Sequence, residues 1–175
     1  MKRIILIGYM GAGKTTIGKA LARLLSRPFY DLDQYIESRQ RKTVADIFAE
    51  SGEAGFRKIE RNMLHEVAEF EEVIISCGGG TPCFSDNMEY LNQQGETVYL
   101  KATPQVLREH LLMGKTVRPL IQGKSPDELL QYIEESLKAR QPFYEQALHT
   151  IDINVIHTQE EIINYANLIN EKVAH

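Results

Sequence analysis

Short apolar runs alternate with longer amphipathic segments along the whole chain. Each run is rich in Ile, Val, Leu or aromatic residues, which is typical of strands buried on both faces of a sheet. The runs predicted to be strands are 3–7, 28–32, 73–77, 97–101 and 151–155.

The segments between these runs have helical periodicity and helix start signals. Apolar residues form one stripe over 14–25, and 56–70 is amphipathic in the same way. Thr103 before Pro104 is typical of an N-cap followed by a proline in the first turn. The other predicted helices are one that starts after Thr43, 127–140, and 159–173 with Thr158 as its cap.

Strands that alternate with helices over short connections predict an α/β fold with a parallel sheet and right-handed crossovers. At 175 residues the chain has the length of one domain, 1–175. Ligands of such sheets bind where the strands end, so any motif that follows a strand is a candidate site. The segment 113–125 fits no regular element and is long enough to be a loop that moves.

Charge and composition exclude several classes of function. The net charge is −4 and there is no long basic run, which argues against nucleic acid as a partner. No apolar stretch reaches the length of about 20 residues that a membrane span needs. Cys77 and Cys83 have no metal-ligand spacing, so we expect reduced thiols in a cytoplasmic protein.

The sequence GYMGAGKTT, residues 8–16, follows the first strand and opens the first helix. It matches the phosphate-binding P-loop pattern, because Gly8, Gly13, Lys14 and Thr15 stand at its required positions. Glycines let successive main-chain amides point inward at an anion. Lys14 can then reach the β- and γ-phosphates, and the Thr15 hydroxyl can ligate Mg²⁺.

A second group of polar residues indicates an acceptor other than water. Asp31 and Asp33 follow the second strand, and if both continue that strand they point the same way, toward the phosphates. One could serve the metal and the other a substrate hydroxyl. Two solvated surface acids are the alternative.

Further candidates follow the next strand and helix. Arg57 and Glu60 share a helix face, either as a surface ion pair or with Arg57 clamping a carboxylate. Gly78, Gly79 and Gly80 come straight after a strand and could expose bare backbone to a ligand or form a simple tight turn. Ser76 could hold a metal-bound water or bond to backbone.

Two arginines complete the set. Arg118 lies in the loop 113–125, where it could swing over a transferring phosphate, and Arg140 follows a helix in KARQPFY. For each of them a solvated surface arginine is the alternative.

In order along the chain, GYMGAGKTT, DLD, GEAGFRKIE, CGGGTP, RPLI and KARQPFYEQA resemble the shikimate kinase family. The resemblance covers nearly the whole chain. It implies a P-loop kinase with a three-layer α/β/α fold, a five-stranded parallel sheet, a helical substrate-binding section at about 33–60 and a mobile lid at about 112–125. It implies transfer of the ATP γ-phosphoryl group to the 3-hydroxyl of shikimate, in a cytoplasmic monomer of aromatic amino-acid biosynthesis.

Carried over residue by residue, the resemblance implies the following roles. Lys14, Asp33 and Arg118 would be catalytic. ATP would contact Gly11, Ala12, Gly13, Lys14, Thr15, Thr16 and Arg118, and Mg²⁺ would bind Thr15 and Asp31. Shikimate would contact Asp33, Arg57, Gly78, Gly79, Gly80 and Arg140.

The chain departs from the family pattern at Cys77 and at the adenine contacts, where Arg108 lies near the expected arginine but is shifted. Three alternative functions remain at this stage. They are a kinase for gluconate or a nucleoside monophosphate, a GTPase-type switch, and a nucleotide-binding module without catalysis. The absence of an N-K-x-D motif argues against the switch.

Overall fold

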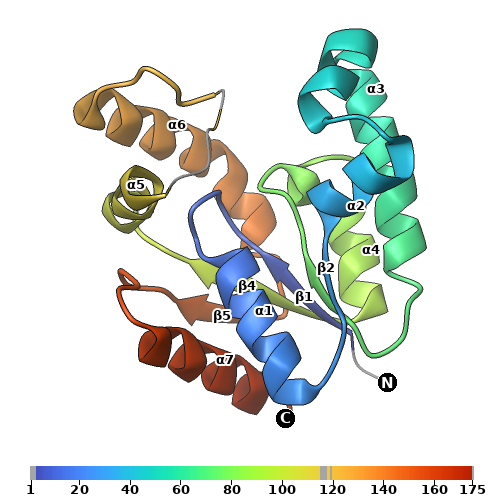
Figure 1. Ribbon diagram of the computed structural model, residues 1–175, viewed down its shortest axis with the longest axis vertical. Helices are drawn as coiled ribbons and strands as arrows, with labels where there is room; N and C mark the ends of the chain where they lie inside the picture. The colour runs from blue at the N-terminus through green and yellow to red at the C-terminus, as the bar shows by residue number, and fades with distance from the viewer. Residues whose placement is uncertain (1–2, 115–117, 119, 175) are drawn as a thin grey trace.

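The computed structural model describes residues 3–114, 118 and 120–174. Five parallel strands form one sheet in the order β2-β3-β1-β4-β5 (Figure 1). Their bounds are Ile4–Ile7 for β1, Phe29–Asp31 for β2, Ile74–Ser76 for β3, Glu96–Lys101 for β4 and His149–Asp152 for β5. The predicted α/β class with a five-stranded parallel sheet is confirmed.

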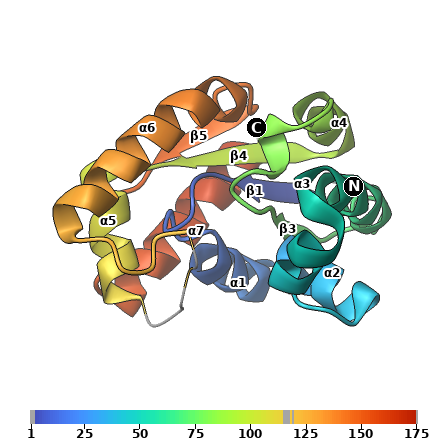
Figure 2. The ribbon, with the colours of Figure 1, turned by 90° about the horizontal axis from the view of Figure 1, so that it is seen from above.

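Helices cover both faces of this sheet. Figure 2 shows α1 and α7 on one side and α4 and α6 on the other, so the molecule has three layers. The helices are α1 (Lys14–Leu25), α2 (Leu32–Gln40), α3 (Val44–Val67), α4 (Asn87–Gln94), α5 (Pro104–Met113), α6 (Pro126–Tyr144) and α7 (Gln159–Val173), with a short 3₁₀ turn η1 (Thr81–Cys83).

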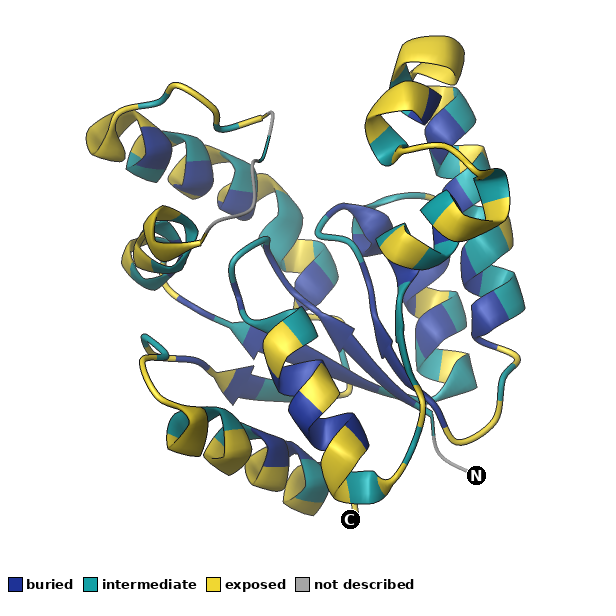
Figure 3. Ribbon diagram, in the orientation of Figure 1, coloured by how far each residue is buried: buried dark blue, intermediate teal, exposed yellow. Residues whose placement is uncertain are grey.

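The central strand β1 is buried over its whole length, because it lies between β3 and β4 and is covered on both faces. Its continuous apolar sequence IILI is what such a position requires. Figure 3 shows the same burial along the other inner strands and on the helix faces that meet the sheet. In the part of the chain that the structure describes, no helix combines the length and apolarity needed to cross a membrane.

Most predicted elements are present, but the last strand is displaced. β5 runs over His149–Asp152 instead of 151–155. Its partner β4 ends at Lys101, which pairs with Asp152, so the ladder stops there apart from one bond from Ile153 N to Lys101 O of 2.7 Å. Asn154 N then donates to the Tyr165 hydroxyl at 2.9 Å, which takes the backbone away from the sheet.

The prediction that Asp31 and Asp33 lie on one strand is wrong. β2 ends at Asp31, and α2, which the sequence did not suggest, begins at Leu32. Asp31 is the N-cap of this helix and its side chain accepts from Gln34 N, while Asp33 lies in the first turn. The two carboxylates still face the same space, for a different geometric reason.

Several helix boundaries also differ from those predicted. The predicted helix 56–70 is the second half of α3, which starts after the predicted cap Thr43, changes direction at Gly52 (φ 68°) and ends at Val67. α6 continues four residues beyond 140 to Tyr144, with Pro142 inside it. The turn η1 and helix α4 were not predicted.

Candidate active site

The P-loop connects β1 to α1 at the centre of the sheet. Gly8 and Gly13 have φ angles of 151° and 97°, which residues with a side chain rarely adopt. A Cβ at Gly8 would also lie 2.8 Å from the main-chain oxygen of Leu100. The loop can therefore keep this main-chain conformation only with glycine at these positions.

Lys14 begins α1, and its side chain folds back across the loop. Its Nζ donates to the carbonyl oxygens of Gly8 at 2.6 Å and Tyr9 at 3.0 Å. Burial, aided by the positive charge of Arg118, lowers the pKa of Lys14 to about 8. Together with the amides at the start of α1, this ammonium group makes the loop a strong anion site.

Thr15 and Asp31 bring oxygen ligands together beside the loop. The Thr15 hydroxyl donates to Asp31 Oδ2 at 3.1 Å. Asp31 pairs in register with Ser76 on β3, so the hydroxyl of Ser76 also borders this space. A hydroxyl and one carboxylate fit Mg²⁺, which keeps most of its ligands as water and phosphate oxygens. Among the described residues there is no cluster of three His, Cys, Asp or Glu that would form an all-protein metal cage.

Asp33 lines the same cavity as the P-loop. A Cβ at Gly78 would come within 3.2 Å of Asp33 Oδ1, so the carboxylate lies directly against the glycine run. Burial, followed by the negative charges of Asp31 and Glu60, raises the pKa of Asp33 to about 6, and Lys14 opposes the shift. A carboxylate with this pKa can accept a proton near neutral pH.

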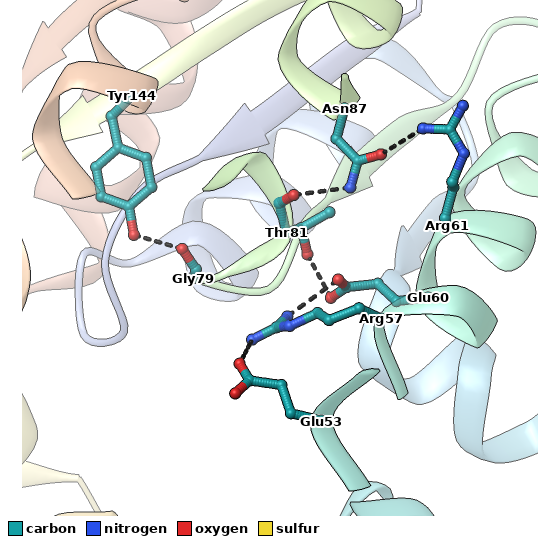
Figure 4. A network of polar contacts seen from close by, with 8 residues as sticks. All are labelled: Glu53, Arg57, Glu60, Arg61, Gly79, Thr81, Asn87 and Tyr144. Carbon is teal, nitrogen blue, oxygen red and sulfur yellow. Dashed lines mark hydrogen bonds and ion pairs between the residues drawn. The ribbon is translucent and has the colours of Figure 1, made fainter. Parts of the chain in front are cut away.

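Arg57 of α3 belongs to a network of polar groups that extends to η1 and the start of α4 (Figure 4). Its Nη1 donates to Glu60 Oε1 at 3.0 Å, and the Thr81 hydroxyl donates to Glu60 Oε2 at 2.9 Å. Asn87 Nδ2 in turn donates to the Thr81 carbonyl oxygen at 2.8 Å. The Glu60 side chain is only 2% exposed, so the surface ion pair that the sequence left open is not what forms.

The guanidinium of Arg57 keeps donors for a ligand. It stacks over the ring of Phe84 at 3.9 Å, which fixes its plane. Its Nη2 lies 3.6 Å from the exposed carboxylate of Glu53. Within the described part of the chain, its buried Nε has no hydrogen-bond partner. A carboxylate arriving here would find a preoriented cation.

The glycine run lies between two arginines. A Cβ at Gly80 would be 2.7 Å from Arg57 Nη2, and one at Gly79 would be 3.2 Å from Arg140 Nη1. Any side chain at these positions would therefore displace a guanidinium group. The hydroxyl of Tyr144, one turn beyond Arg140 on α6, donates to the Gly79 carbonyl oxygen (Figure 4).

A cavity of about 780 Å³ joins most of these groups. It reaches Gly11, Gly13, Lys14, Thr15, Thr16, Asp31, Asp33, Gly78, Gly79 and Arg118 among the predicted site residues. Ala12, Gly80, Arg57 and Arg140 do not line it. Ala12 N donates to the Tyr9 carbonyl oxygen at 3.1 Å, whereas both arginines lie against the glycine run that borders the cavity.

Part of the predicted lid also reaches the cavity. Arg118 lines it, as do Met113 and Gly114 at the end of α5. Residues 115–117 and 119 of the predicted lid lie outside the described residues. Burial raises the pKa of the thiols of Cys77 and Cys83, so both stay protonated.

Sequence reasoning missed one wall of the cavity. His110 on α5 and the connection from Ile156 to Gln159 line it, together with Ile162 of α7. No motif marks these residues, because they meet only through the fold. Arg108, considered for an adenine contact, does not line the cavity and lies 4.0 Å from Asp127 of α6.

Comparison with known proteins identifies the family. The family model described as shikimate kinase matches residues 10–169. The chain belongs to the shikimate kinase family. A shikimate kinase of Bacteroides thetaiotaomicron is 54% identical over 171 residues, which are 98% of this chain and 98% of that protein.

Solved structures agree with this family. The crystal structure of shikimate kinase from Bacteroides thetaiotaomicron superposes with a TM-score of 0.96 at 52% identity, over 99% of both chains. Shikimate kinase from Acinetobacter baumannii, solved in complex with shikimate, gives 0.84 at 35% identity, over 99% of this chain and 93% of that one. The predicted membership of the shikimate kinase family is confirmed. The chain is an enzyme, a phosphotransferase whose family reaction is the phosphorylation of shikimate in aromatic amino-acid biosynthesis.

Proposed function

We propose that the cavity transfers the γ-phosphoryl group of ATP to the 3-hydroxyl of shikimate, which gives shikimate 3-phosphate and ADP. One observation supports this most: Lys14 of the P-loop and the carboxylate of Asp33 face the same cavity, with two arginines beside it. A phosphate site and a site for a small acidic alcohol are therefore neighbours.

On the nucleotide side, the residues from Gly11 to Thr16 would hold the ATP phosphates with main-chain amides and the α1 N-terminus. Lys14 would leave its two carbonyl partners for the β- and γ-phosphates. Arg118, which lines the same cavity, would neutralise charge on the transferring group. Thr15 and Asp31 would hold Mg²⁺, which when bound shields the phosphate charges.

On the acceptor side, Arg57 and Arg140 would bind the carboxylate of shikimate, and the bare backbone of Gly78–Gly80 would let its ring approach. Asp33 would orient the attacking hydroxyl. Because both arginines act far from the reacting oxygen, their binding energy serves alignment.

The chemical step needs little from the protein besides alignment and charge. The hydroxyl oxygen forms a bond to the γ-phosphorus while the bond to the ADP oxygen breaks, and the hydroxyl proton passes to Asp33. The transition state spreads charge over the equatorial oxygens, where Lys14 and Arg118 supply positive charge.

We also propose a single domain over 1–175, with a substrate-binding section at about 33–60 and a lid at about 112–125 that closes over ATP and excludes water. The protein would act as a monomer in the cytoplasm. The free thiols of Cys77 and Cys83 support that compartment.

The test is ADP release with shikimate, gluconate, AMP or no acceptor, each with Mg²⁺ and ATP. We expect release with shikimate alone. Release with gluconate or AMP but not with shikimate would contradict the proposed acceptor, and equal release without any acceptor would indicate an ATPase.

A further inference from the structure

His110, in the last turn of α5, has hydrogen bonds at both of its ring nitrogens. Its Nδ1 lies 2.7 Å from the carbonyl oxygen of Gly11 in the P-loop. Its Nε2 accepts from the main-chain amide of Ile156, in the connection between β5 and α7, at 2.9 Å. One side chain thus links three segments that are distant in the sequence.

These two partners determine which nitrogen carries the hydrogen. A main-chain amide can only donate, so Nε2 must present its lone pair to Ile156. A carbonyl oxygen can only accept, so Nδ1 must carry the hydrogen that bonds to Gly11. His110 is therefore held as the neutral Nδ1–H tautomer, and no other standard side chain offers a donor and an acceptor in this rigid arrangement.

Close packing surrounds these bonds. A Cβ at Gly11 would come within 3.0 Å of Leu111 Cγ, and one at Gly13 within 3.2 Å of Ile156 Cδ1. The end of α5 and the connection at Ile156 thus both pack against the glycines of the P-loop. His110, Ile156 and these glycines all line the cavity.

We propose that His110 is a positioning residue for the nucleotide. Its two hydrogen bonds set the distance between the P-loop and the connection at Ile156, and ATP would bind between these two segments. This rests on the proposed function, in which the P-loop holds the phosphates. The remainder of the nucleotide then extends along the cavity wall from Ile156 to Gln159. Because this segment is already held in place before ATP binds, binding does not need to spend free energy on ordering it.

Three substitutions of His110 test its two hydrogen bonds separately. His110→Leu removes both. His110→Asn keeps an amide N–H near the Nδ1 position for Gly11 and loses the acceptor for Ile156. His110→Gln reaches the Nε2 position with an oxygen that can accept from Ile156 and loses the bond to Gly11.

We expect His110→Leu to raise the KM for ATP and the Kd for ADP about tenfold, as the loss of two ordinary hydrogen bonds predicts. The Asn and Gln variants should each recover part of this loss. The KM for shikimate and kcat at saturation should stay within about twofold. The matched control is His149→Leu, which breaks a bond between His149 Nε2 and Glu96 at 2.6 Å on strands away from the cavity.

A role in folding alone would lower the amount of active enzyme, and with it the apparent kcat, while leaving both KM values unchanged; that result would overturn the proposal. An equal rise in both KM values would do so too, as would His110→Leu with an unchanged Kd for ADP. Failure of the proposed function itself would be distinct, because the unmodified chain would then release no ADP on addition of shikimate.

Discussion

Burial shifts the pKa values of two charged groups in the cavity toward neutral pH, one upward and one downward. The pKa of Asp33 rises to about 6 and that of Lys14 falls to about 8. Between these values both groups are ionised, which is the state that the proposed reaction needs. The two side chains therefore define a pH window for the free enzyme.

This window predicts a bell-shaped profile. kcat/KM for shikimate should fall as pH drops through about 6, because protonated Asp33 cannot take the hydroxyl proton. kcat/KM for ATP should fall as pH rises through about 8, because neutral Lys14 attracts phosphate poorly. The upper limb of kcat should lie at higher pH, since bound phosphates raise the pKa of Lys14. Initial rates across pH measure all three, and a kcat/KM for ATP that is flat up to about pH 9 would contradict the Lys14 assignment.

Asp33→Asn should lower activity and raise the free energy of unfolding. We expect kcat to fall at least about 10²-fold, because the acceptor of the hydroxyl proton is lost. The folded-state pKa of Asp33 is above its unfolded value, so its protonated form favours folding and that contribution is lost as pH rises from about 4 to about 6. Ionised Asp33 thus costs stability at about pH 7.5, and the neutral amide should raise the free energy of unfolding by about 1 to 2 kcal/mol.

Steady-state kinetics and urea unfolding check both parts. Asp152→Asn, at an exposed position on β5 that does not line the cavity, is the matched control and should change neither. A fully active Asp33→Asn enzyme would remove Asp33 from the chemistry.

Arg57→Ala should raise the KM for shikimate at least tenfold and leave the KM for ATP within about twofold, because the cation is proposed to bind only the acceptor carboxylate. The control is Arg39→Ala, which removes an exposed pair with Glu66 at 3.1 Å. If both arginine variants have the KM for shikimate of the unmodified enzyme, the carboxylate clamp is wrong.

Helix α6 contacts both the glycine run and the P-loop. Arg140 and Tyr144 lie one turn apart on it and reach the same glycine, while Ser136 bonds the hydroxyl of Tyr9 in the P-loop at 2.6 Å. One rigid helix thus fixes the glycine run relative to the phosphate loop.

Tyr144→Phe removes a single hydroxyl from this arrangement. Burial raises the pKa of this hydroxyl, so it stays protonated and donates to the Gly79 carbonyl oxygen. We expect its loss to raise the KM for shikimate about three- to tenfold, with the KM for ATP nearly unchanged, as one hydrogen bond predicts. Tyr99→Phe, in a ring that packs on Tyr144 at 5.2 Å between centroids, is the control. Equal effects of the two variants would indicate packing instead of positioning.

Helices and strands with a strong local pattern could be predicted, and those whose limits depend on partners could not. The stripe over 14–25 predicted α1 with its correct ends. β5 was displaced because its length depends on where β4 ends and on Tyr165, which takes the amide of Asn154. α2 was missed because Leu32 looks like the end of a strand, whereas the Asp31 cap turns the chain into a helix there.

For the whole molecule, strand order creates the site. β1 lies between β3 and β4, and β2 lies beyond β3, so the P-loop, the glycine run and Asp31 lie at the carboxyl ends of three adjacent strands. Parallel strands end on the same side, which is why motifs that are far apart in the sequence meet in one cavity.

The whole chain should be a monomer of 20.0 kDa, measurable by light scattering coupled to size-exclusion chromatography. Large exposed apolar side chains of the described residues are spread over α1, α5, the segment after it, the connection from α6 to β5, and α7. They include Leu24, Leu112, Leu120, Leu148 and Leu168. Scattered residues of this kind do not make an interface. Specific activity should therefore not depend on enzyme concentration, and a stable dimer mass would contradict the prediction.

Local signals were enough to reveal the parallel α/β architecture, the phosphate loop and the order of motifs that identifies the family. Each depends on neighbours in the chain: glycine torsion angles, helix caps and runs of apolar residues. Three features emerged only after folding. They are the hydrogen bond of Arg57 to the buried Glu60, the pKa values of Asp33 and Lys14, and the bridge of His110 between Gly11 and Ile156. Burial and hydrogen bonding between residues far apart in the chain depend on packing, and no local pattern records them.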